Sequence, residues 1–417
     1  MGIYEIEGGR PLRGTVCIQG AKNSVLPILA ATVATRGCCI IENCPYISDV
    51  ETALSILRCI GCETCRDGNR IRVDSRLATG SEIPGELMGK MRAAVIFLGA
   101  LLTRFGEAHL SNPGGCCLGE RPIDYHLRGL RHMGASCEYE DCVLHCCGKK
   151  LEACTIALPF PSVGATENLL LAALSAHGEV VICNAAKEPE ITDLIRFLRA
   201  CGGEITGEGT TVLRIRGGRP LHGVRYRVMP DRMEAATYLA AAAATRGELR
   251  LEQVCPSHLT ALTRVLRDAG CELEMGEKTL HLSCSELRAV PPIRTAPYDG
   301  FPTDAQAPVM AAMATAKGVT IFEESVFSDR FRHVPALQAM GANIHAAGCH
   351  AVVQGVARLH GAQVEATDLR GGAAMVIAAL SAEGFSRILK TEHMERGYGD
   401  FVGNLRACGA DITTEGQ

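Results

Sequence analysis

Long apolar segments that end at a glycine recur along the whole chain. One of them, Thr237–Gly247 (TYLAAAAATRG), is apolar nearly all round, and a helix with this pattern is expected to be buried on every side. Its last glycine suits a left-handed helix cap. A short strand (ELRLEQV), an amphipathic helix (LTALTRVLRDAG) and two strands with alternating apolar residues follow. The pattern therefore predicts a repeated α/β unit of βαβαββ type.

The same unit occurs six times. A Leu-x-x-x-Gly motif ends each predicted amphipathic helix, and successive glycines of the motif lie 73, 68, 68, 71 and 68 residues apart. These glycines are Gly61, Gly134, Gly202, Gly270, Gly341 and Gly409. We expect a two-lobed, inside-out α/β barrel with three units in each lobe. Its apolar helices lie inside and its sheets outside, the reverse of an ordinary α/β barrel.

Repeated short motifs indicate where the lobes divide. The sequence GGRPL-x-G occurs near the start of the chain and again 209 residues later. The last unit lacks the strand pair that closes the other five, so we expect Ile3–Ile18 to complete it and both termini to belong to one lobe. The lobes are then residues 22–229 and residues 1–21 with 230–417. Two crossings of the chain favour a hinge that closes around a ligand. The crossings lie near residues 20–22 and 229–231.

Composition and charge narrow the classes of function. The chain has 417 residues, of which 47% are hydrophobic and 21% charged, and its formal net charge is -4. This balance excludes a disordered chain and gives no electrostatic reason to expect nucleic acid. Aromatic residues are scarce at 4%, so stacking platforms for bases are not expected. The start has no apolar signal region and no apolar run approaches the length of a membrane span, so we expect a soluble, cytoplasmic protein without a membrane partner.

Cysteine is abundant, with 21 residues. An odd count without an export signal favours reduced thiols over a disulfide framework. Cys59, Cys62 and Cys65 form a C-x-x-C-x-x-C run, but no second C-x-x-C lies at the spacing of a zinc ribbon. We therefore expect no metal site and interpret most cysteines as small buried apolar residues.

Charged side chains and a glycine-rich loop supply the candidate catalytic and binding residues. The loop, PGGCCLGERP at residues 113–122, is long for a connection inside a unit, which favours a functional loop. Lysine and arginine together indicate an anion site, because a guanidinium group matches the geometry of phosphate and carboxylate. An acid and a thiol supply groups that can transfer protons. Each residue alone could equally form a surface ion pair or cap a helix. The candidates near predicted helix starts are Lys22, Asn23, Asp304, Arg330, Arg370 and Arg396.

The chain resembles the enolpyruvyl transferase family nearly from end to end. The segments that carry the resemblance include GAKNSVLPILAAT, PGGCCLGERPIDYHLRGL, MPDRMEAAT, RTAPYDGFPTDAQA and ERGYGDF. PGGC-x-x-G-x-RP-x-D-x-H and FPTD-x-Q are the most specific of its motifs, and they are typical of the branch that acts on UDP-N-acetylglucosamine. The sister branch, which acts on shikimate 3-phosphate, is expected to have GSKS-x-SNR where this chain has GAKNSVLP.

The resemblance implies a reaction. The enolpyruvyl group of phosphoenolpyruvate is transferred to the 3-hydroxyl of UDP-N-acetylglucosamine by addition and elimination, phosphate is released, and the product enters peptidoglycan precursor synthesis as its first committed step. No metal or other cofactor is implied, because fixed cationic side chains stabilise the charge. The alternatives are a shikimate 3-phosphate enolpyruvyl transferase and a non-catalytic repeat scaffold. A scaffold would scatter the charged residues and the thiol over outer faces, whereas the enzyme brings them together in one cleft between the lobes.

The resemblance also implies residue roles. Asp304 is implied to take the proton of the sugar hydroxyl, and Arg330 to orient Asp304 or a ligand phosphate. Cys116 is implied as the loop thiol of acid catalysis or product release and as the target of fosfomycin. Phosphoenolpyruvate is implied to contact Lys22, Arg121 and Arg396, with Arg92 and Arg370 adding positive potential. The implied contacts to the UDP-sugar are Asn23, Arg121, Pro122, Ile123, Asp124, Ser162, Val163, Gly164, Asp304 and Val326.

Three places depart from the family pattern. Phe160 stands where a lysine often lies near the uridine. Residues Gly397–Gly403 read GYGDFVG in place of the usual GYERIED. Cys117 follows Cys116, so the loop carries two adjacent thiols.

Overall fold

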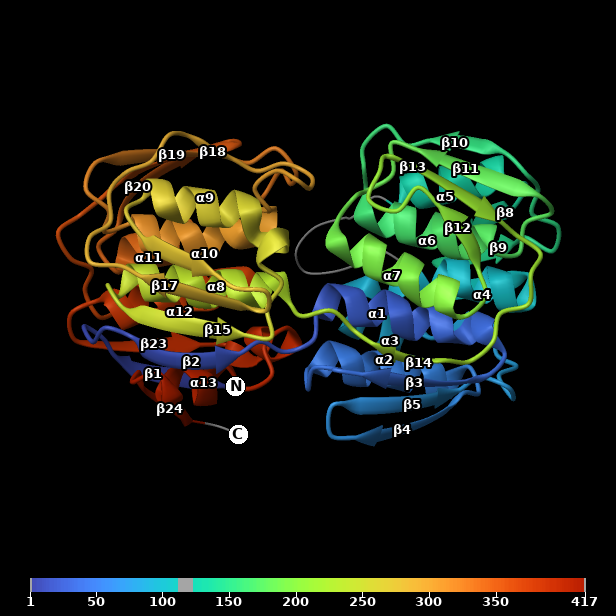
Figure 1. Cartoon of the computed structure of the whole chain (residues 1–417), viewed down its shortest axis with the longest axis horizontal. Coiled ribbons are helices and arrows are strands. Elements are labelled where there is room, and N and C mark those ends of the chain that lie inside the picture. The colour runs from blue at the N-terminus through green and yellow to red at the C-terminus, as the bar shows by residue number, and fades with distance from the viewer. Residues whose placement is uncertain (1, 112–122, 416–417) are drawn as a thin grey trace. The chain divides into compact units, whose positions relative to one another are not determined.

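The chain folds into two compact units. The computed structural model describes residues 2–111 and 123–415. Residues up to Gln19 and from Pro230 onward form one unit, which contains both ends of the chain and is called the terminal unit below. Gly20–Met229 form the other, the middle unit. Over the described residues each unit has three four-stranded sheets on the outside and three buried helices inside (Figure 1). This confirms the predicted six-unit, inside-out α/β architecture.

In the middle unit the strand orders are β14-β3-β5-β4, β6-β7-β9-β8 and β10-β11-β13-β12. The strands are β3 (Cys38–Glu42), β4 (Glu63–Asp67), β5 (Arg70–Asp74), β6 (Glu82–Ile83), β7 (Glu107–Ser111), β8 (Ser136–Glu140), β9 (Val143–Cys147), β10 (Thr155–Ala157), β11 (Glu179–Cys183), β12 (Glu204–Thr206), β13 (Val212–Arg216) and β14 (Arg225–Arg227). The helices are α1 (Lys22–Ala31), η1 (Thr32–Thr35), α2 (Ser48–Cys59), α3 (Gly85–Lys90), η2 (Arg92–Ile96), α4 (Phe97–Phe105), α5 (Asp124–His132), α6 (Val163–Ala173) and α7 (Pro189–Ala200).

In the terminal unit the strand orders are β22-β23-β1-β24, β16-β17-β15-β2 and β18-β19-β21-β20. The strands are β1 (Ile3–Glu7), β2 (Arg13–Cys17), β15 (Glu248–Glu252), β16 (Glu272–Met275), β17 (Thr279–Ser283), β18 (Ile293–Arg294), β19 (Val319–Glu323), β20 (Asn343–Ala347), β21 (His350–Gln354), β22 (Gln363–Glu365), β23 (Phe385–Leu389) and β24 (Asp411–Glu415). The helices are α8 (Arg232–Ala244), η3 (Pro256–Leu259), α9 (Thr260–Asp268), α10 (Thr303–Met313), α11 (Val334–Ala339), α12 (Leu369–Ser381), η4 (Thr391–Arg396) and α13 (Phe401–Ala407).

Apolar residues on every side place one helix of each repeat in the interior. All thirteen residues of α8 are buried, as are nine of the eleven residues of α6. The second helix of each repeat has one apolar stripe and covers the inner helices, as α7 does against α6 and α1. The strands alternate buried and exposed side chains, so each sheet packs one face on the core and leaves the other to water, as in β11 and β13.

The leading segment of the chain completes two sheets, and the expectation that all of it completes the sixth repeat is wrong. β1 lies between β23 and β24 and does complete that repeat. β2 instead pairs in parallel with β15, with Arg13 opposite Glu248. The reason is an exchange of edge strands between repeats. β14, which precedes α8, pairs with β3, so the parallel edge beside β15 is filled by β2, which precedes α1.

The two repeated motifs GGRPL-x-G and ATRG pack on each other, which explains why they occur together. In the middle unit a side chain at Gly37 of ATRG would come within 2.6 Å of the backbone nitrogen of Gly223. In the terminal unit a side chain at Gly247 would lie 2.2 Å from the carbonyl oxygen of Leu12. Both contacts require glycine because the backbones touch.

Candidate active site

Several of the residues that the sequence singles out lie where the inner helices begin. In the middle unit Lys22 and Asn23 open α1, Arg92 opens the η2 turn before α4, and Ser162 precedes α6. The first backbone N–H groups of a helix have no partner within the helix, and together with the helix dipole they favour anions. The middle unit therefore presents candidate anion-binding ends of buried helices.

Lys22 is held by a buried carboxylate. Its Nζ lies 2.7 Å from Oδ2 of Asp49, which belongs to the first turn of α2. The side chain of Lys22 is 12% exposed and that of Asp49 is 3% exposed. The pair fixes the lysine at the start of α1 and leaves only a small part of its charge in contact with water.

Asp193 of α7 anchors the start of α1 to the segment that leaves the middle unit. Ser24 Oγ donates a hydrogen bond of 2.5 Å to Asp193 Oδ2, and the Tyr226 hydroxyl donates one of 2.6 Å to Oδ1. The backbone N–H of Met229 adds a third at 3.1 Å. Burial raises the pKa of Asp193 and these hydrogen bonds oppose that rise. The carboxylate therefore fixes the position of α1 beside Lys22 and Asn23.

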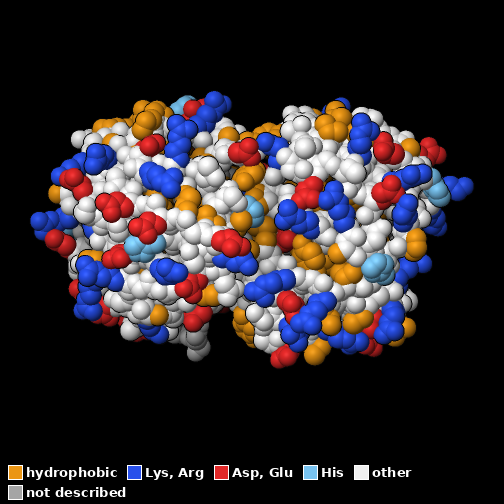
Figure 2. Space-filling model, viewed as in Figure 1, with side chains coloured by type: hydrophobic (Ala, Val, Ile, Leu, Met, Phe, Trp, Pro, Cys, Tyr) orange, Lys and Arg blue, Asp and Glu red, His pale blue; other side chains and the backbone are white. Residues whose placement is uncertain are grey.

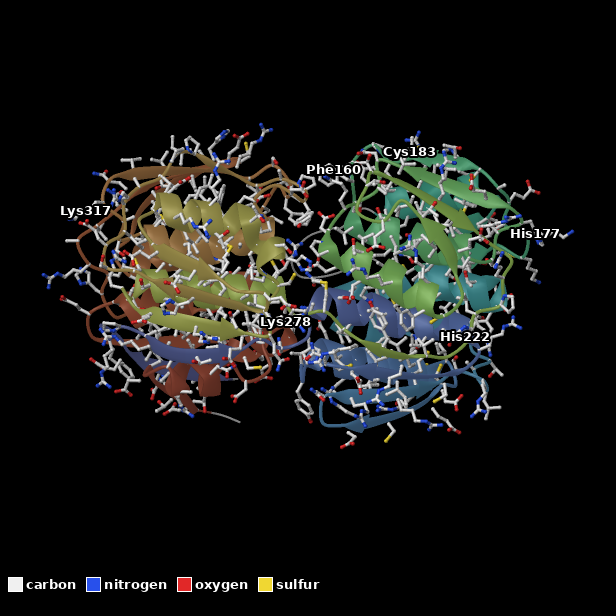
Figure 3. All side chains as sticks on the ribbon, viewed as in Figure 1. Phe160, His177, Cys183, His222, Lys278 and Lys317 are labelled. Atoms are coloured by element: carbon white, nitrogen blue, oxygen red, sulfur yellow. The ribbon has the colours of Figure 1, made fainter. Side chains whose placement is uncertain are left out.

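The structure brings together two segments that the resemblance assigns to the UDP-sugar. Ser162 caps α6 by accepting a hydrogen bond from the N–H of Ala165 (3.3 Å). A side chain at Gly164 would lie 3.3 Å from the ring of His126, so the start of α6 contacts α5. Ile123 is buried just before α5, and Asp124 is exposed at its first position. Val163 is partly buried, and Phe160 lies in the loop that leads into α6 (Figure 3).

His126 is neutral inside the middle unit. Burial lowers its pKa to about 4. Asn168 Nδ2 lies 2.8 Å from its Nδ1 and donates to it, while Asn168 Oδ1 accepts from the N–H of Gly99 at the start of α4. One amide side chain thus ties α6 to α4 and α5 near the ends that carry the candidate residues.

In the terminal unit the structure brings Asp304, Arg330 and Arg370 together. Arg330 Nη2 lies 2.6 Å from Asp304 Oδ1. Arg370 donates to Oδ2 through Nη2 at 3.1 Å and Nε at 3.3 Å. The carboxylate belongs to the first turn of α10, and its side chain is 29% exposed. Two guanidinium groups and the helix start favour its ionised form.

Arg370 is more deeply buried than Arg330. Arg370, the second residue of α12, has only 6% of its side chain exposed, and its Nη1 donates to the Tyr398 hydroxyl at 3.0 Å. Burial alone would lower the pKa of Arg370, but Tyr398 and Asp304 raise it above its ordinary value. Arg330 lies in the irregular segment between β19 and α11, and its side chain is 18% exposed.

Two further carboxylates, one buried and one partly buried, fix the segments around this cluster. Glu324 accepts hydrogen bonds from the Thr303 hydroxyl and from the backbone N–H of Val326, both at 2.9 Å, and so orients the segment that carries Val326. Asp368 caps α12 by accepting from the N–H groups of Arg370 and Gly371. Arg396 ends η4 in the same unit.

Some predicted residues lie outside the part of the chain that the structure describes. These are Cys116, Arg121 and Pro122, together with the side chain of Arg92. The others divide between the units. The middle unit contains Lys22, Asn23, Ile123, Asp124, Ser162, Val163 and Gly164, and the terminal unit contains Asp304, Val326, Arg330, Arg370 and Arg396.

Comparison with known proteins supplies the family. Residues 6–405 match the sequence model of the family described as EPSP synthase (3-phosphoshikimate 1-carboxyvinyltransferase). The chain is 46% identical to UDP-N-acetylglucosamine 1-carboxyvinyltransferase 2 of Caldanaerobacter subterraneus subsp. tengcongensis, over 99% of both chains. It is also 46% identical to UDP-N-acetylglucosamine 1-carboxyvinyltransferase of Shewanella amazonensis, over 99% of both.

The chain belongs to the enolpyruvyl transferase family.

Among solved structures, the enolpyruvyl transferase NikO from Streptomyces tendae matches with a TM-score of 0.91 and 27% identity, over 99% of this chain and 98% of that one. The fold is therefore that of a catalytic family. Asp304, Arg330 and Arg370 also converge within one unit, which the scaffold alternative does not predict. The curated relatives at 46% identity have the name of the UDP-N-acetylglucosamine branch, so the shikimate 3-phosphate alternative is not favoured.

Sequence reasoning missed several residues that hold the candidate site of this enolpyruvyl transferase in place. They are Asp49, Asp193, Glu324, Asp368 and Tyr398. Tyr398 lies in ERGYGDF, a segment quoted for the resemblance, and Asp368 in ATDLRGG two residues before Arg370. Because Tyr398 and Asp368 lie next to predicted site residues, the sequence could have indicated both as site residues. Glu324 likewise lies two residues before Val326, whereas Asp193 gives no comparable signal, because its partners Ser24, Tyr226 and Met229 lie far away in the sequence.

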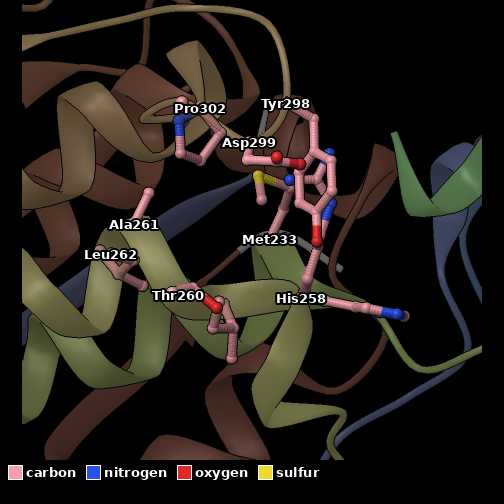
Figure 4. Close-up of a pocket in the computed structure, with 11 residues that line it drawn as sticks. Met233, His258, Thr260, Ala261, Leu262, Tyr298, Asp299 and Pro302 are labelled. Atoms are coloured by element: carbon pink, nitrogen blue, oxygen red, sulfur yellow. The ribbon is translucent and has the colours of Figure 1, made fainter. Parts of the chain in front are cut away.

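The terminal unit also has a pocket of about 370 Å³ (Figure 4). It lies between the start of α8, η3 with the first turn of α9, and the segment 298–302. The guanidinium of Arg232 lies 5.4 Å from the centre of the Tyr298 ring in its wall. Pro302, the residue before α10, also lines it, so the pocket borders the helix that carries Asp304.

Lysine, arginine and acidic side chains are intermixed on the face of each unit seen in Figure 2. Among the residues that the structure describes, no three His, Cys, Asp or Glu side chains gather as metal ligands would. No helix in the described ranges is both long and apolar enough to cross a bilayer.

Proposed function

We propose that this chain transfers the enolpyruvyl group of phosphoenolpyruvate to the 3-hydroxyl of UDP-N-acetylglucosamine. The observation that carries the proposal is the Asp304 carboxylate, which lies at the start of a buried helix between two arginines, inside the family motif FPTD-x-Q. The curated relatives have the name of this activity over their full length. In the cell this reaction is the first committed step of peptidoglycan precursor synthesis and takes place in the cytoplasm.

The chemistry consists of an addition followed by an elimination. The sugar oxygen bonds to C2 of phosphoenolpyruvate, the hydroxyl proton passes to a base, and a proton is added to the methylene carbon C3. The tetrahedral product carries both the sugar ether and the phosphate on C2. C3 then loses a proton and the bond between C2 and the phosphate oxygen breaks. Phosphate leaves, the carbon–carbon double bond forms again, and the enol ether remains on the sugar.

Asp304 acts as the base for the sugar hydroxyl in this proposal. The ionised form that a base requires is favoured by the guanidinium groups of Arg330 and Arg370. The same pairing weakens the carboxylate as a base, so proton removal accompanies the attack on C2, during which the hydroxyl becomes more acidic. Arg370 fixes the direction of the carboxylate, because it is buried and contacts Oδ2 through two N–H groups.

Both units supply the anion contacts in this proposal. Lys22 binds the phosphate of phosphoenolpyruvate at the start of α1, together with Arg121 and Arg396, while Arg92 and Arg370 add positive potential. The starts of α5 and α6 bind the UDP-sugar. Its contacts are Asn23, Arg121, Pro122, Ile123, Asp124, Ser162, Val163, Gly164, Asp304 and Val326.

Residues of both units act on one substrate pair in this proposal. The chain crosses between them twice, and the crossings act as the hinge. Cys116 supplies a thiol for acid catalysis or product release. Arg330 exchanges between Asp304 and a ligand phosphate, which its partial exposure on an irregular segment permits.

A phosphate-release assay tests the proposal. Phosphate should appear only when UDP-N-acetylglucosamine and phosphoenolpyruvate are both present, and mass spectrometry should find the enolpyruvyl ether of the sugar nucleotide. Shikimate 3-phosphate in place of the sugar nucleotide is the control and should give no product. Release with shikimate 3-phosphate alone, or no release with either acceptor, would contradict the proposal.

Inhibition by fosfomycin tests the assignment of the thiol. An epoxide phosphonate should inactivate the enzyme by bonding to Cys116, since positive charge around the phosphoenolpyruvate site favours the thiolate. Cys116→Asp should keep some activity, because a carboxylic acid can still transfer the proton, and should resist the inhibitor. Peptide mass spectrometry locates the adduct. An adduct on Cys117 would move the assignment by one residue.

A further inference from the structure

A chain of polar side chains runs through the apolar interior of the terminal unit and ends at Asp304. Tyr398 is its central member, with 2% of the residue exposed. Its hydroxyl lies 3.0 Å from Arg370 Nη1 and 2.7 Å from Thr237 Oγ1 of α8. Its ring stacks on Phe401 at 4.6 Å between centroids. Tyr398 therefore connects α8 to α12 and, through Arg370, to α10.

The direction of each hydrogen bond in this chain follows from the donors available. Thr237 Oγ1 donates its proton to the carbonyl oxygen of Met233 at 3.0 Å, so toward Tyr398 it accepts. Arg370 can only donate. The Tyr398 hydroxyl must therefore accept from Arg370 and donate to Thr237, which requires the neutral phenol. Burial raises the pKa of Tyr398, with Asp231 acting in the same direction and Arg370 against it, so the neutral form is the one present near pH 7.

These contacts determine how Arg370 faces Asp304. A guanidinium is planar, so a hydrogen bond that fixes Nη1 also fixes the plane and the opposite edge. That edge carries Nε and Nη2, which both contact Asp304 Oδ2. We infer that Tyr398 is a positioning residue for the reaction: its hydroxyl orients Arg370 so that the guanidinium fixes and polarises the Asp304 carboxylate. The inference rests on the proposed function for its effect on turnover.

Tyr398→Phe tests this role because it keeps the ring and removes only the hydroxyl. Arg370 Nη1 loses its acceptor and the guanidinium can turn away from Asp304. We expect kcat to fall about tenfold with little change in KM, since the misdirected group acts on the reacting proton more than on ground-state binding. With less positive charge on its oxygen, Asp304 should bind a proton more readily. The acidic limb of the kcat profile should therefore move to higher pH, by about half a unit or more.

Tyr238→Phe is the matched control. Tyr238 is fully buried in the same unit, its ring lies 5.8 Å from that of Phe401, and its hydroxyl accepts a hydrogen bond from Asn404 at 3.1 Å. The control thus loses one buried hydroxyl next to the same phenylalanine, but this hydroxyl is bonded to Asn404, whereas that of Tyr398 is bonded to Arg370. Both variants should lower the melting temperature by similar amounts. The control should keep kcat within about twofold and leave the acidic limb unmoved.

Thr237→Val supplies a second variant that keeps the phenol and removes only its acceptor. It should move kcat and the acidic limb in the same direction as Tyr398→Phe, but less, because Arg370 still has its partner. This variant decides the question if Tyr398→Phe does not fold.

The outcomes separate the inference from the proposed function. Equal losses of kcat in Tyr398→Phe and Tyr238→Phe, or an acidic limb that stays in place in Tyr398→Phe and Thr237→Val, would overturn the positioning role. An inactive wild-type enzyme would instead overturn the proposed function. In that case carboxyl-carbon NMR of the substrate-free protein decides the inference. The Asp304 signal, assigned by its loss in Asp304→Asn, should titrate at higher pH in Tyr398→Phe than in the wild type, and identical titrations would refute the role.

Discussion

The start of α10 in the terminal unit carries an acid paired with bases, whereas the start of α1 in the middle unit carries a base paired with an acid. At α10 an acid, Asp304, lies between two bases, Arg330 and Arg370. At α1 a base, Lys22, lies on one acid, Asp49. Asp304 keeps 29% of its side chain exposed, whereas Lys22 keeps 12%. The first arrangement has a surplus of one positive charge among its three members, and the second has none.

This difference indicates how each site can respond to an anionic substrate. The Asp304 cluster can attract a phosphate and still keep its carboxylate paired, because one guanidinium is enough to hold it. Lys22 has to be shared between its carboxylate and the incoming phosphate. A buried carboxylate that loses its cation is costly, so Lys22 stays near Asp49 and the substrate comes to it. Substitutions at the two helix starts therefore should have different consequences.

Asp304→Ala should have the largest effect. A general base contributes about 10²–10⁴ in rate, so kcat should fall by about a thousandfold or more while the fold is kept. Phosphate release measures the loss, and the melting temperature reports the fold. Asp329→Ala, which removes an exposed aspartate paired with Arg332, is the control and should keep normal turnover. Full activity of Asp304→Ala would mean that Asp304 is not the general base and only stabilises the start of α10.

Lys22→Met should have the next largest effect. It removes a cation from a largely buried helix start, where water cannot replace the charge, and we expect kcat/KM for phosphoenolpyruvate to fall about 10²–10³-fold. Lys278→Met, at an exposed turn of the terminal unit, is the control. Near-normal kcat/KM in Lys22→Met would remove the lysine from the proposed phosphate site.

Acid should destabilise both units through one buried histidine in each. Burial lowers the pKa of His126 and of His333 to about 4, whereas an unfolded histidine titrates near 6.5. Their stabilising effect is complete above about pH 6.5 and is lost as the pH falls toward about 4, because only the unfolded state binds the proton in that range. Each histidine should lower the free energy of unfolding by about 2 kcal/mol by about pH 5.

The measurement is the melting temperature from pH 7 to 5 in the wild type, His126→Gln and His333→Gln. Each variant should show a shallower loss of stability with acid than the wild type. Asp368 and Arg330 face His333 and act in opposite directions, so the change in His126→Gln is the cleaner of the two. Equal slopes in all three proteins would show that neither histidine is neutral in the folded state.

Asp49→Asn should have the smallest effect on turnover. The amide keeps the shape and removes the negative charge that orients Lys22, and we expect kcat/KM for phosphoenolpyruvate to fall about tenfold. Asp49→Asn should thus lie well above Lys22→Met in activity. If the two variants were equally impaired, Asp49 would itself take part in the chemistry, and the comparison between the two helix starts would need revision.

Much of the fold could be predicted from the sequence, because regular glycine spacing and helices that are apolar on every side, such as Thr237–Gly247, indicate the repeats. It could not show that β2 joins the sheet of β15, since an exchanged edge strand has the same pattern as one that stays in its own repeat. At the site, Asp304 and Lys22 could be singled out by position and resemblance. Asp49 could not, because it meets Lys22 only in the folded chain. Tyr398 lies in a segment quoted for the resemblance, but its contact with Arg370 is created only by folding.

The proposed enolpyruvyl transfer breaks the bond between C2 of phosphoenolpyruvate and the phosphate oxygen. Phosphoenolpyruvate with a heavy-oxygen label at that bridging oxygen tests it most directly, with UDP-N-acetylglucosamine as acceptor and mass spectrometry of both products. All of the label should leave in the released phosphate, and the sugar nucleotide should gain an unlabelled enolpyruvyl ether. Label retained in the carbon product, with unlabelled phosphate, would mean that the bond to phosphorus breaks instead, and would contradict the account.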